Sequence, residues 1–216
     1  MTGKTKVTNG IIYILWIFLA WSIYVAMLYA KVDPLSEPFK IIINESIRFL
    51  IFAATAVLIV FHHQASYQQL GLMGIQTKGI SSALLICLSY VVIASCIAIF
   101  VQNKTFKLPC SYSFWVTAFS ISTIIEEICF RGILFFLFSQ LNKKILVIIT
   151  SVAFSGIHFP GLYLFPIHPT SAAFATDAIA IFILGCILGW IYLKTRSIWC
   201  TSCLHSINNL LAAGFA

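Results

Sequence analysis

Two adjacent glutamates and an arginine lie inside an otherwise apolar stretch, STIIEEICFRGIL at residues 122–134. Charged residues at the centre of a membrane helix each cost ~2.5–3.5 kcal/mol, so their presence there is a functional signal by default. Glu127 and Arg131 are four residues apart, so they share one helical face and can pair. Glu126 lies ~100° around the helix, which leaves its carboxylate for another partner. The alternative is that Glu126 only serves packing or meets a cation elsewhere.

A second polar constellation follows in VAFSGIHFPG at residues 152–161, where Phe154 and His158 are four residues apart. The turn around residues 142–144 lets the two helices form an antiparallel hairpin. Counted along the helices from that turn, Glu126 lies ~25 Å away and His158 ~22 Å away, so they come to nearly the same height. A histidine near a helix end is more often an interfacial residue. The matched height favours a site shared by Glu126 and His158.

The last apolar segment, WCTSCLHSINNL at residues 199–210, places His205 and Asn209 four residues apart. Both side chains can donate hydrogen bonds from one face, which suits an oxyanion hole. The alternative is polar contact between helices, which is common in membranes.

A zinc site of one Glu and two His also has to be weighed. However, the H-E-x-x-H pattern is absent, and Cys200 and Cys203 form a C-x-x-C without a second pair. We therefore expect no metal and no cofactor.

The composition is that of a membrane protein. Of the 216 residues, 61% are hydrophobic and only 9% are charged, whereas soluble domains carry roughly a quarter charged residues. The net charge of +7 comes from Lys and Arg residues that lie singly or in pairs between apolar runs. No basic tract could follow a phosphate backbone, which excludes a nucleic-acid partner. The seven cysteines are scattered through apolar segments, so they predict small hydrophobic filler rather than a disulfide framework.

Seven apolar runs predict an all-α, polytopic membrane bundle of about seven transmembrane helices, because backbone in lipid must satisfy its own hydrogen bonds. The runs are 11–30, 41–62, 80–101, 113–138, 145–158, 172–193 and 197–215, the fifth unusually short. The first is too long for a signal-peptide core of ~7–15 residues, so it reads as a retained span. Basic residues in the loops divide seven against four, which predicts a cytoplasmic N-terminus. We expect a single membrane domain over residues 1–216, with N-terminal transmembrane helices at 1–112 and a catalytic core at 113–213.

Four other features have simpler interpretations. Glu45 and Arg48 are three residues apart and predict a local ion pair. Gly185 and Gly189 form a small-xxx-small pattern that predicts close helix packing. The proline- and aromatic-rich stretch at 159–169 suggests a lid or lateral gate. His168, inside that stretch, is expected to be solvated.

The segments EEICFR, FSGIH and HSINN, in this order, resemble the CPBP (ABI) family of intramembrane glutamic endopeptidases, which are related to the CAAX prenyl endopeptidases. The family motifs E-E-x-x-x-R, F-x-x-x-H and H-x-x-x-N are all complete. The resemblance covers roughly residues 113–213, and residues 1–110 carry nothing specific. It implies that Glu126 and His158 activate a water, and that His205 and Asn209 stabilise the oxyanion.

The resemblance also assigns a supporting role to Glu127, Arg131 and Phe154. It implies hydrolysis of a peptide bond in a membrane-associated protein or peptide, lipidated or not. The absence of a targeting presequence favours a bacterial plasma membrane, and nothing in the chain indicates the oligomeric state.

One competing function is a non-proteolytic bacteriocin-immunity or scaffold protein, which would keep its function in Glu126→Ala. The other is a proton-coupled transporter, although paired discontinuous helices are not apparent.

Overall fold

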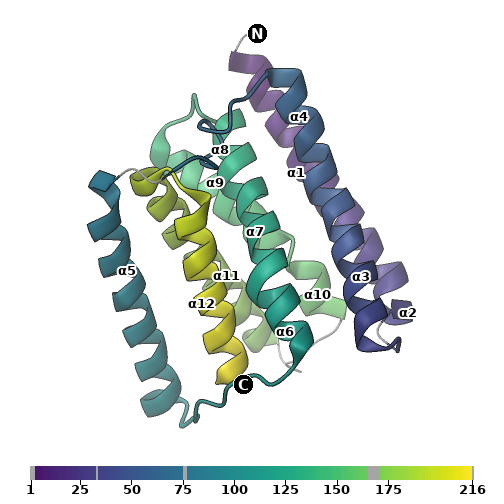
Figure 1. The fold of residues 1–216 in the computed structure, drawn as a ribbon, viewed down its shortest axis with the longest axis vertical. Helices are drawn as coiled ribbons and strands as arrows, with labels where there is room; N and C mark the ends of the chain where they lie inside the picture. Colours follow the sequence, from purple (N-terminus) through teal and green to yellow (C-terminus); the bar gives the residue numbers. More distant parts are fainter. Residues whose placement is uncertain (1–2, 33, 75–76, 165–170, 216) are drawn as a thin grey trace.

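The computed structural model describes residues 3–32, 34–74, 77–164 and 171–215, and the regular elements within these ranges are all helices (Figure 1). The helices are α1 (Gly3–Tyr24), η1 (Val25–Tyr29), α2 (Ala30–Val32), α3 (Glu37–Arg48), η2 (Phe49–Ala54), α4 (Thr55–His63), α5 (Thr77–Cys96), η3 (Ile97–Val101), α6 (Tyr112–Val116), η4 (Thr117–Ile121), α7 (Ser122–Glu127), η5 (Ile128–Ile133), α8 (Leu134–Leu137), α9 (Lys143–Gly156), α10 (Phe159–Leu164), α11 (Ser171–Thr195) and α12 (Ile198–Gly214). Each element labelled η is a short π-helical stretch. They continue the neighbouring α-helices, so the described residues form seven helical rods and no strand.

The predicted all-α membrane bundle is therefore confirmed. Five helices are long and apolar enough to cross a membrane, and they make the chain an integral membrane protein. They are Thr5–Tyr29, Glu37–His63, Gly79–Val101, Lys143–Leu164 and Phe174–Thr195. The two remaining rods, α6 to α8 and α12, hold two of the three polar motifs, and Figure 1 shows them in the middle of the bundle.

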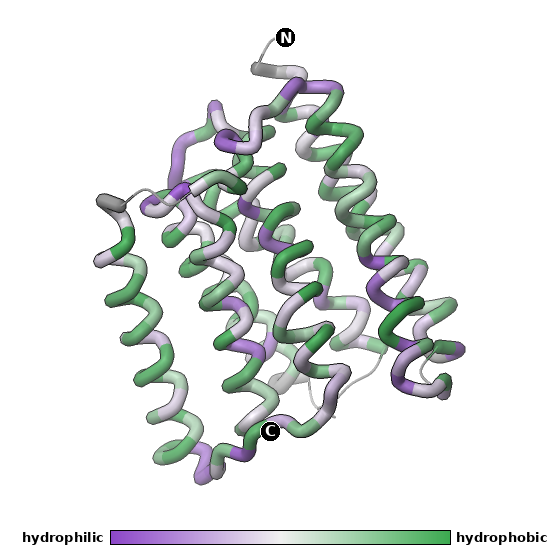
Figure 2. Tube along the Cα trace, in the orientation of Figure 1, coloured by the Kyte–Doolittle hydropathy of each residue, from purple (hydrophilic) through white to green (hydrophobic). Residues whose placement is uncertain are grey.

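The burial pattern explains this arrangement. Figure 2 shows hydrophilic positions along α7 and α12, whereas α5 is mostly hydrophobic. Glu127 of α7 and His205 of α12 are buried, and Leu85 of α5 is exposed. The side chains from Cys129 to Phe138 are all buried. A rod that carries three charges is thus surrounded by protein, which spares those charges direct contact with lipid.

The fifth membrane helix is not short, and that prediction was wrong. α9 ends at Gly156 and α10 begins after two residues, which together give a span of 22 residues from Lys143 to Leu164. The amide of Leu162 donates to the carbonyl of His158 over 3.0 Å across the junction. Pro160 occupies the first turn of α10, where a proline costs no hydrogen bond. The junction therefore only interrupts the span, and it does so at His158.

The close packing predicted for Gly185 and Gly189 is confirmed. These glycines bring α11 against α9, so that a Cβ built on Gly185 would lie 3.0 Å from the Cβ of Ser151. A Cβ on Gly189 would lie 3.2 Å from a methyl group of Val147. The absence of side chains lets the two backbones approach, as in other small-residue helix contacts in membranes. This contact sets the position of α9, which carries Phe154.

Candidate active site

α7 lies between two π-helical stretches and places both glutamates in the interior of the bundle. Glu127 and Arg131 are fully buried, and their side chains pair at 3.2 Å from Nη1 to Oε1. The predicted pairing within the helix is confirmed. Arg131 also donates from Nη2 to the carbonyl of Gly185 over 3.1 Å, and its guanidinium lies 4.6 Å from the ring centroid of Phe154. Arg131 thus connects three of the helical rods.

His205 of α12 contacts both glutamates. Its Nδ1 lies 3.0 Å from Oε1 of Glu127, and its Nε2 lies 3.9 Å from Oε2 of Glu126. A carboxylate accepts hydrogen bonds, so Nδ1 is the donor in the shorter contact. The ion pair of Glu127 and Arg131 therefore fixes the orientation of the His205 ring. This orientation in turn sets the distance between Nε2 of His205 and the carboxylate of Glu126.

Asn209 lies one turn further along α12, where its amide nitrogen donates to the backbone carbonyl of Ala118 over 2.7 Å. Ser206 similarly donates to the carbonyl of Phe119. Both carbonyls belong to η4, a rare type of helix that is frequent at functional sites. One of the two amide hydrogens of Asn209 is thus engaged, and the other remains for a further acceptor.

Phe154 separates the two histidines. Its ring centroid lies 5.0 Å from that of His158 and 5.4 Å from that of His205, and both ring pairs are edge-to-face. Nδ1 of His158 lies 2.8 Å from the carbonyl oxygen of Phe154. Because a carbonyl can only accept, this nitrogen carries a hydrogen, and in the neutral ring the lone pair is on Nε2. Phe154 therefore supports both histidines by packing and by its backbone.

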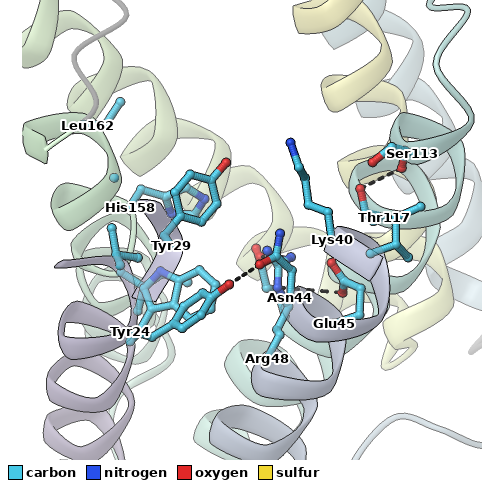
Figure 3. A pocket seen from close by; sticks show the side chains of 16 residues that line it. Tyr24, Tyr29, Lys40, Asn44, Glu45, Arg48, Ser113, Thr117, His158 and Leu162 are labelled. Atoms are coloured by element: carbon cyan, nitrogen blue, oxygen red, sulfur yellow. Dashed lines mark hydrogen bonds and ion pairs between the residues drawn. The ribbon is translucent and has the colours of Figure 1, made fainter. Parts of the chain in front are cut away.

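Glu126 and His158 line the same cavity, whose volume is about 580 Å³ (Figure 3). The two residues come from α7 and from the α9–α10 junction, so the matched height expected from the sequence corresponds to a shared cavity. The rest of the wall comes from α1, η1, α3, α6, η4 and α10, with aromatic and apolar side chains on α1, η1 and α10 and mostly polar or charged ones on α3. His205 and Asn209 lie outside the lining of this cavity, and His205 is near it only through its contact with Glu126.

Two lining residues have a role that sequence spacing did not indicate. Arg48 and Glu45 form the expected local contact, 3.9 Å from Nε to Oε2. However, Nη1 of Arg48 also lies 3.5 Å from Oε1 of Glu126, across 78 positions of sequence. Glu45 in turn accepts a hydrogen bond of 3.3 Å from Ser122 on α7. The N-terminal half of the chain thus supplies the cation that faces Glu126. An arginine within a membrane span was the signal for it.

The structure also bears on the metal and gate interpretations. Among the described residues, no group of three or more His, Cys, Asp or Glu side chains is arranged to hold a metal ion. Cys200 is half-buried and Cys203 exposed, both as free thiols. In the stretch suggested as a gate, Gly161 and Leu162 of α10 line the cavity. His168 lies outside the described residues.

Residues 107–211 match a protein-family model described as Type II CAAX prenyl endopeptidase Rce1-like. All three motifs lie within the matched residues, so the resemblance drawn from them is confirmed. Arg48 and Glu45 lie outside the match. A search of the curated proteins and a search of the solved structures found no match to this chain.

Proposed function

Because the chain belongs to the Rce1-like type II CAAX prenyl endopeptidase family, whose members are glutamic-type intramembrane proteases, we propose that it hydrolyses a peptide bond of a membrane-associated protein or peptide. The reaction takes place in the cavity lined by Glu126 and His158. The observation that carries the proposal is that these two residues, from separate helices, share one cavity within a membrane bundle. A carboxylate and an imidazole facing one space are the groups needed to activate a water and to return its proton.

In the proposed reaction, a water held between Glu126 and Nε2 of His158 attacks the carbonyl carbon of the scissile bond. Glu126 takes one proton from the water as the new carbon–oxygen bond forms. A proton then passes to the leaving amine through His158, and the carbon–nitrogen bond breaks. The products are a carboxylate and an amine, so one water is consumed and no cofactor is needed.

The carboxylate of Glu126 is held from two sides. Arg48 lies 3.5 Å from Oε1, and His205 lies 3.9 Å from Oε2. A base that is fixed in this way loses little conformational freedom when the water arrives, which is the benefit of a preorganised site. Arg48 is a positioning residue in this scheme, as are Glu127 and Arg131, which act on Glu126 through His205.

We further propose that His205 and Asn209 stabilise the oxyanion. Asn209 retains one amide hydrogen beyond its bond to Ala118. Removal of one oxyanion donor typically lowers kcat by ~10²–10³. Because Asn209 does not line the cavity, this role requires the scissile carbonyl to lie beyond Glu126, on the side that faces α12.

Residues of α3, α6 and α10 line the cavity, and in Figure 1 these elements lie toward the end of the bundle opposite the N-terminus. With the N-terminus cytoplasmic, as the loop charges predict, the substrate would enter from the outer half of a bacterial plasma membrane. Its wall includes Trp21, Tyr24 and Leu162, which suit the apolar side chains of a membrane-associated peptide.

A mass-spectrometric survey of peptide termini in membranes tests this function. Cells would express the wild type, Glu126→Gln or Glu37→Gln at equal levels; Glu37 is an exposed carboxylate at the start of α3 and serves as the control. We expect termini that occur with the wild type and Glu37→Gln and are missing with Glu126→Gln. A chelator added to a parallel wild-type sample should leave them unchanged.

Two outcomes would overturn the proposal. Identical termini in all three membranes would favour an immunity or scaffold protein with the same polar core. Transport of a solute that requires Glu126, without any difference in termini, would favour a proton-coupled transporter.

A further inference from the structure

A second cavity, of about 500 Å³, lies at the other end of the bundle. Lys6 of α1 and Arg196, in the turn between α11 and α12, both line it. Phe135 and Phe136 of α8 form an apolar part of the wall, and the loop after α4 contributes polar residues such as Gln68. These elements meet near the N-terminus in Figure 1, away from the cavity of Glu126.

The charge of this end is uncompensated. The chain has only six acidic residues, and none of them lies in the stretches 64–74, 138–144 or 194–197 that surround the cavity. The basic residues there that the structure describes are Lys6, Lys143, Lys144, Lys194 and Arg196. The ion pairs found among the described residues involve Arg48, Arg131 and His205 instead. An excess of positive charge with no carboxylate beside it attracts an anion.

The loop that walls this cavity is held firmly in place. The amide of Ile198 donates to the carbonyl of Gly71 over 3.0 Å, and Nε1 of Trp199 donates to the carbonyl of Leu72 over 3.1 Å. Gly71 has a φ of 71°, and a Cβ there would lie 2.6 Å from the ring of Tyr192. Leu70 is buried against the bundle. The cavity is therefore a preformed feature rather than a gap beside a loose loop.

Arg196 has an unusual backbone conformation. Its φ is 51°, in the left-handed region, directly after the end of α11, and its amide donates to the carbonyl of Tyr192 over 2.8 Å. Glycine or asparagine usually occupies such a position, because other side chains strain the backbone there. A strained residue at a cavity is a reason to look for a function of its side chain.

We propose that this cavity binds a phosphate group, supplied either by the headgroup of an anionic glycerophospholipid or as free inorganic phosphate. The planar guanidinium of Arg196 can bind two phosphate oxygens at once, and Lys6 adds a compact charge. The ammonium of Lys6 lies 4.0 Å above the ring of Phe136, which keeps it at the cavity. Gln68 and Ser139 add neutral hydrogen-bond donors at the same wall. Basic pockets between membrane helices on the cytoplasmic side are typical headgroup sites.

The test uses the full chain, purified in neutral detergent, and measures its melting temperature and the lipid retained in native mass spectra. The probes are phosphatidylglycerol, phosphatidylcholine with the same acyl chains, and inorganic phosphate. The variants are Lys6→Gln, Arg196→Gln and Arg196→Gly, with Lys144→Gln as a matched control at an exposed cation outside the cavity. Loss of one charged hydrogen bond should weaken binding ~10–100-fold.

We expect phosphatidylglycerol to raise the melting temperature of the wild type and of Lys144→Gln, and to have little effect on the Lys6 and Arg196 variants. Arg196→Gly removes backbone strain, so without lipid it should melt no lower than the wild type. Its loss of lipid response could then not be attributed to misfolding. Protection by inorganic phosphate alone would identify the free ion as the source.

The proposal is overturned if Lys144→Gln loses as much lipid as the cavity variants, which would indicate general charge attraction. Equal retention of phosphatidylglycerol and phosphatidylcholine, with no effect of phosphate, would overturn it as well. None of these measurements depends on proteolytic activity.

Discussion

Replacing Arg131 with methionine should lower the free energy of unfolding by about 3–5 kcal/mol, because the buried carboxylate of Glu127 would lose its cation. Neither side chain of the pair is exposed, and they are 3.2 Å apart. Methionine fills the space of the aliphatic stem but not that of the guanidinium, so part of the loss would come from the space left empty. The variant also loses the bond to the carbonyl of Gly185 and the contact with the ring of Phe154.

A double-mutant cycle isolates the pair from these other contacts. Glu127→Gln leaves Arg131 as a buried cation without its partner, so it should be costly as well, while the amide oxygen can still accept from Nδ1 of His205. The double variant leaves no unpaired charge. It should therefore cost about 2–4 kcal/mol less than the sum of the single changes.

The assay is unfolding in mixed micelles with increasing SDS, followed by tryptophan fluorescence for the four proteins of the cycle. Arg131→Lys is the control, because it keeps the charge but reaches fewer acceptors, and it should lie between the wild type and Arg131→Met. Additive effects, within ~0.5 kcal/mol, would show that the two residues do not interact and would refute the description of the pair.

Three further predictions concern other contacts. Arg48→Gln should lower the cleavage rate ~10–100-fold through loss of a charged contact, and Arg48→Lys should recover part of it; equal rates for both would contradict a positioning role. Gly185→Ala should destabilise the protein by ~1–3 kcal/mol in SDS unfolding, since its Cβ would crowd α9. Gly156→Ala, which meets nothing within 4 Å, should be neutral or stabilising, and similar losses for both would refute the packing argument. Asn209→Ala should reduce kcat by ~10²–10³, whereas Asn208→Ala should change it little; matching values would argue against an oxyanion role.

Local spacing predicted those parts of the site that one helix contains. Glu127 and Arg131 pair because a four-residue separation puts them on one face, and this holds whatever surrounds them. The contact between α9 and α11 followed from Gly185 and Gly189 for a similar reason. The composition alone indicated membrane helices, since no other backbone arrangement was compatible with so apolar a chain.

The spacing of residues along one helix does not predict contacts between helices that are distant in the sequence. The pair of Glu45 and Arg48 looked self-sufficient, yet Arg48 reaches Glu126 because α3 and α7 lie side by side. The fifth apolar run was expected to end at residue 158, but Pro160 fits the first turn of α10 and the span continues to Leu164. The acceptor of Asn209 is a backbone carbonyl of a π-helical stretch, which leaves no sequence signal.

The central claim is that Glu126 activates a water for peptide hydrolysis. Isolated membranes bearing the wild type, Glu126→Gln or Glu37→Gln would be incubated in ¹⁸O-labelled water, and new peptide carboxyl termini carrying ¹⁸O would be identified by mass spectrometry. We expect a set of labelled termini with the wild type and Glu37→Gln that is absent with Glu126→Gln. The same labelled termini in all three membranes would contradict it.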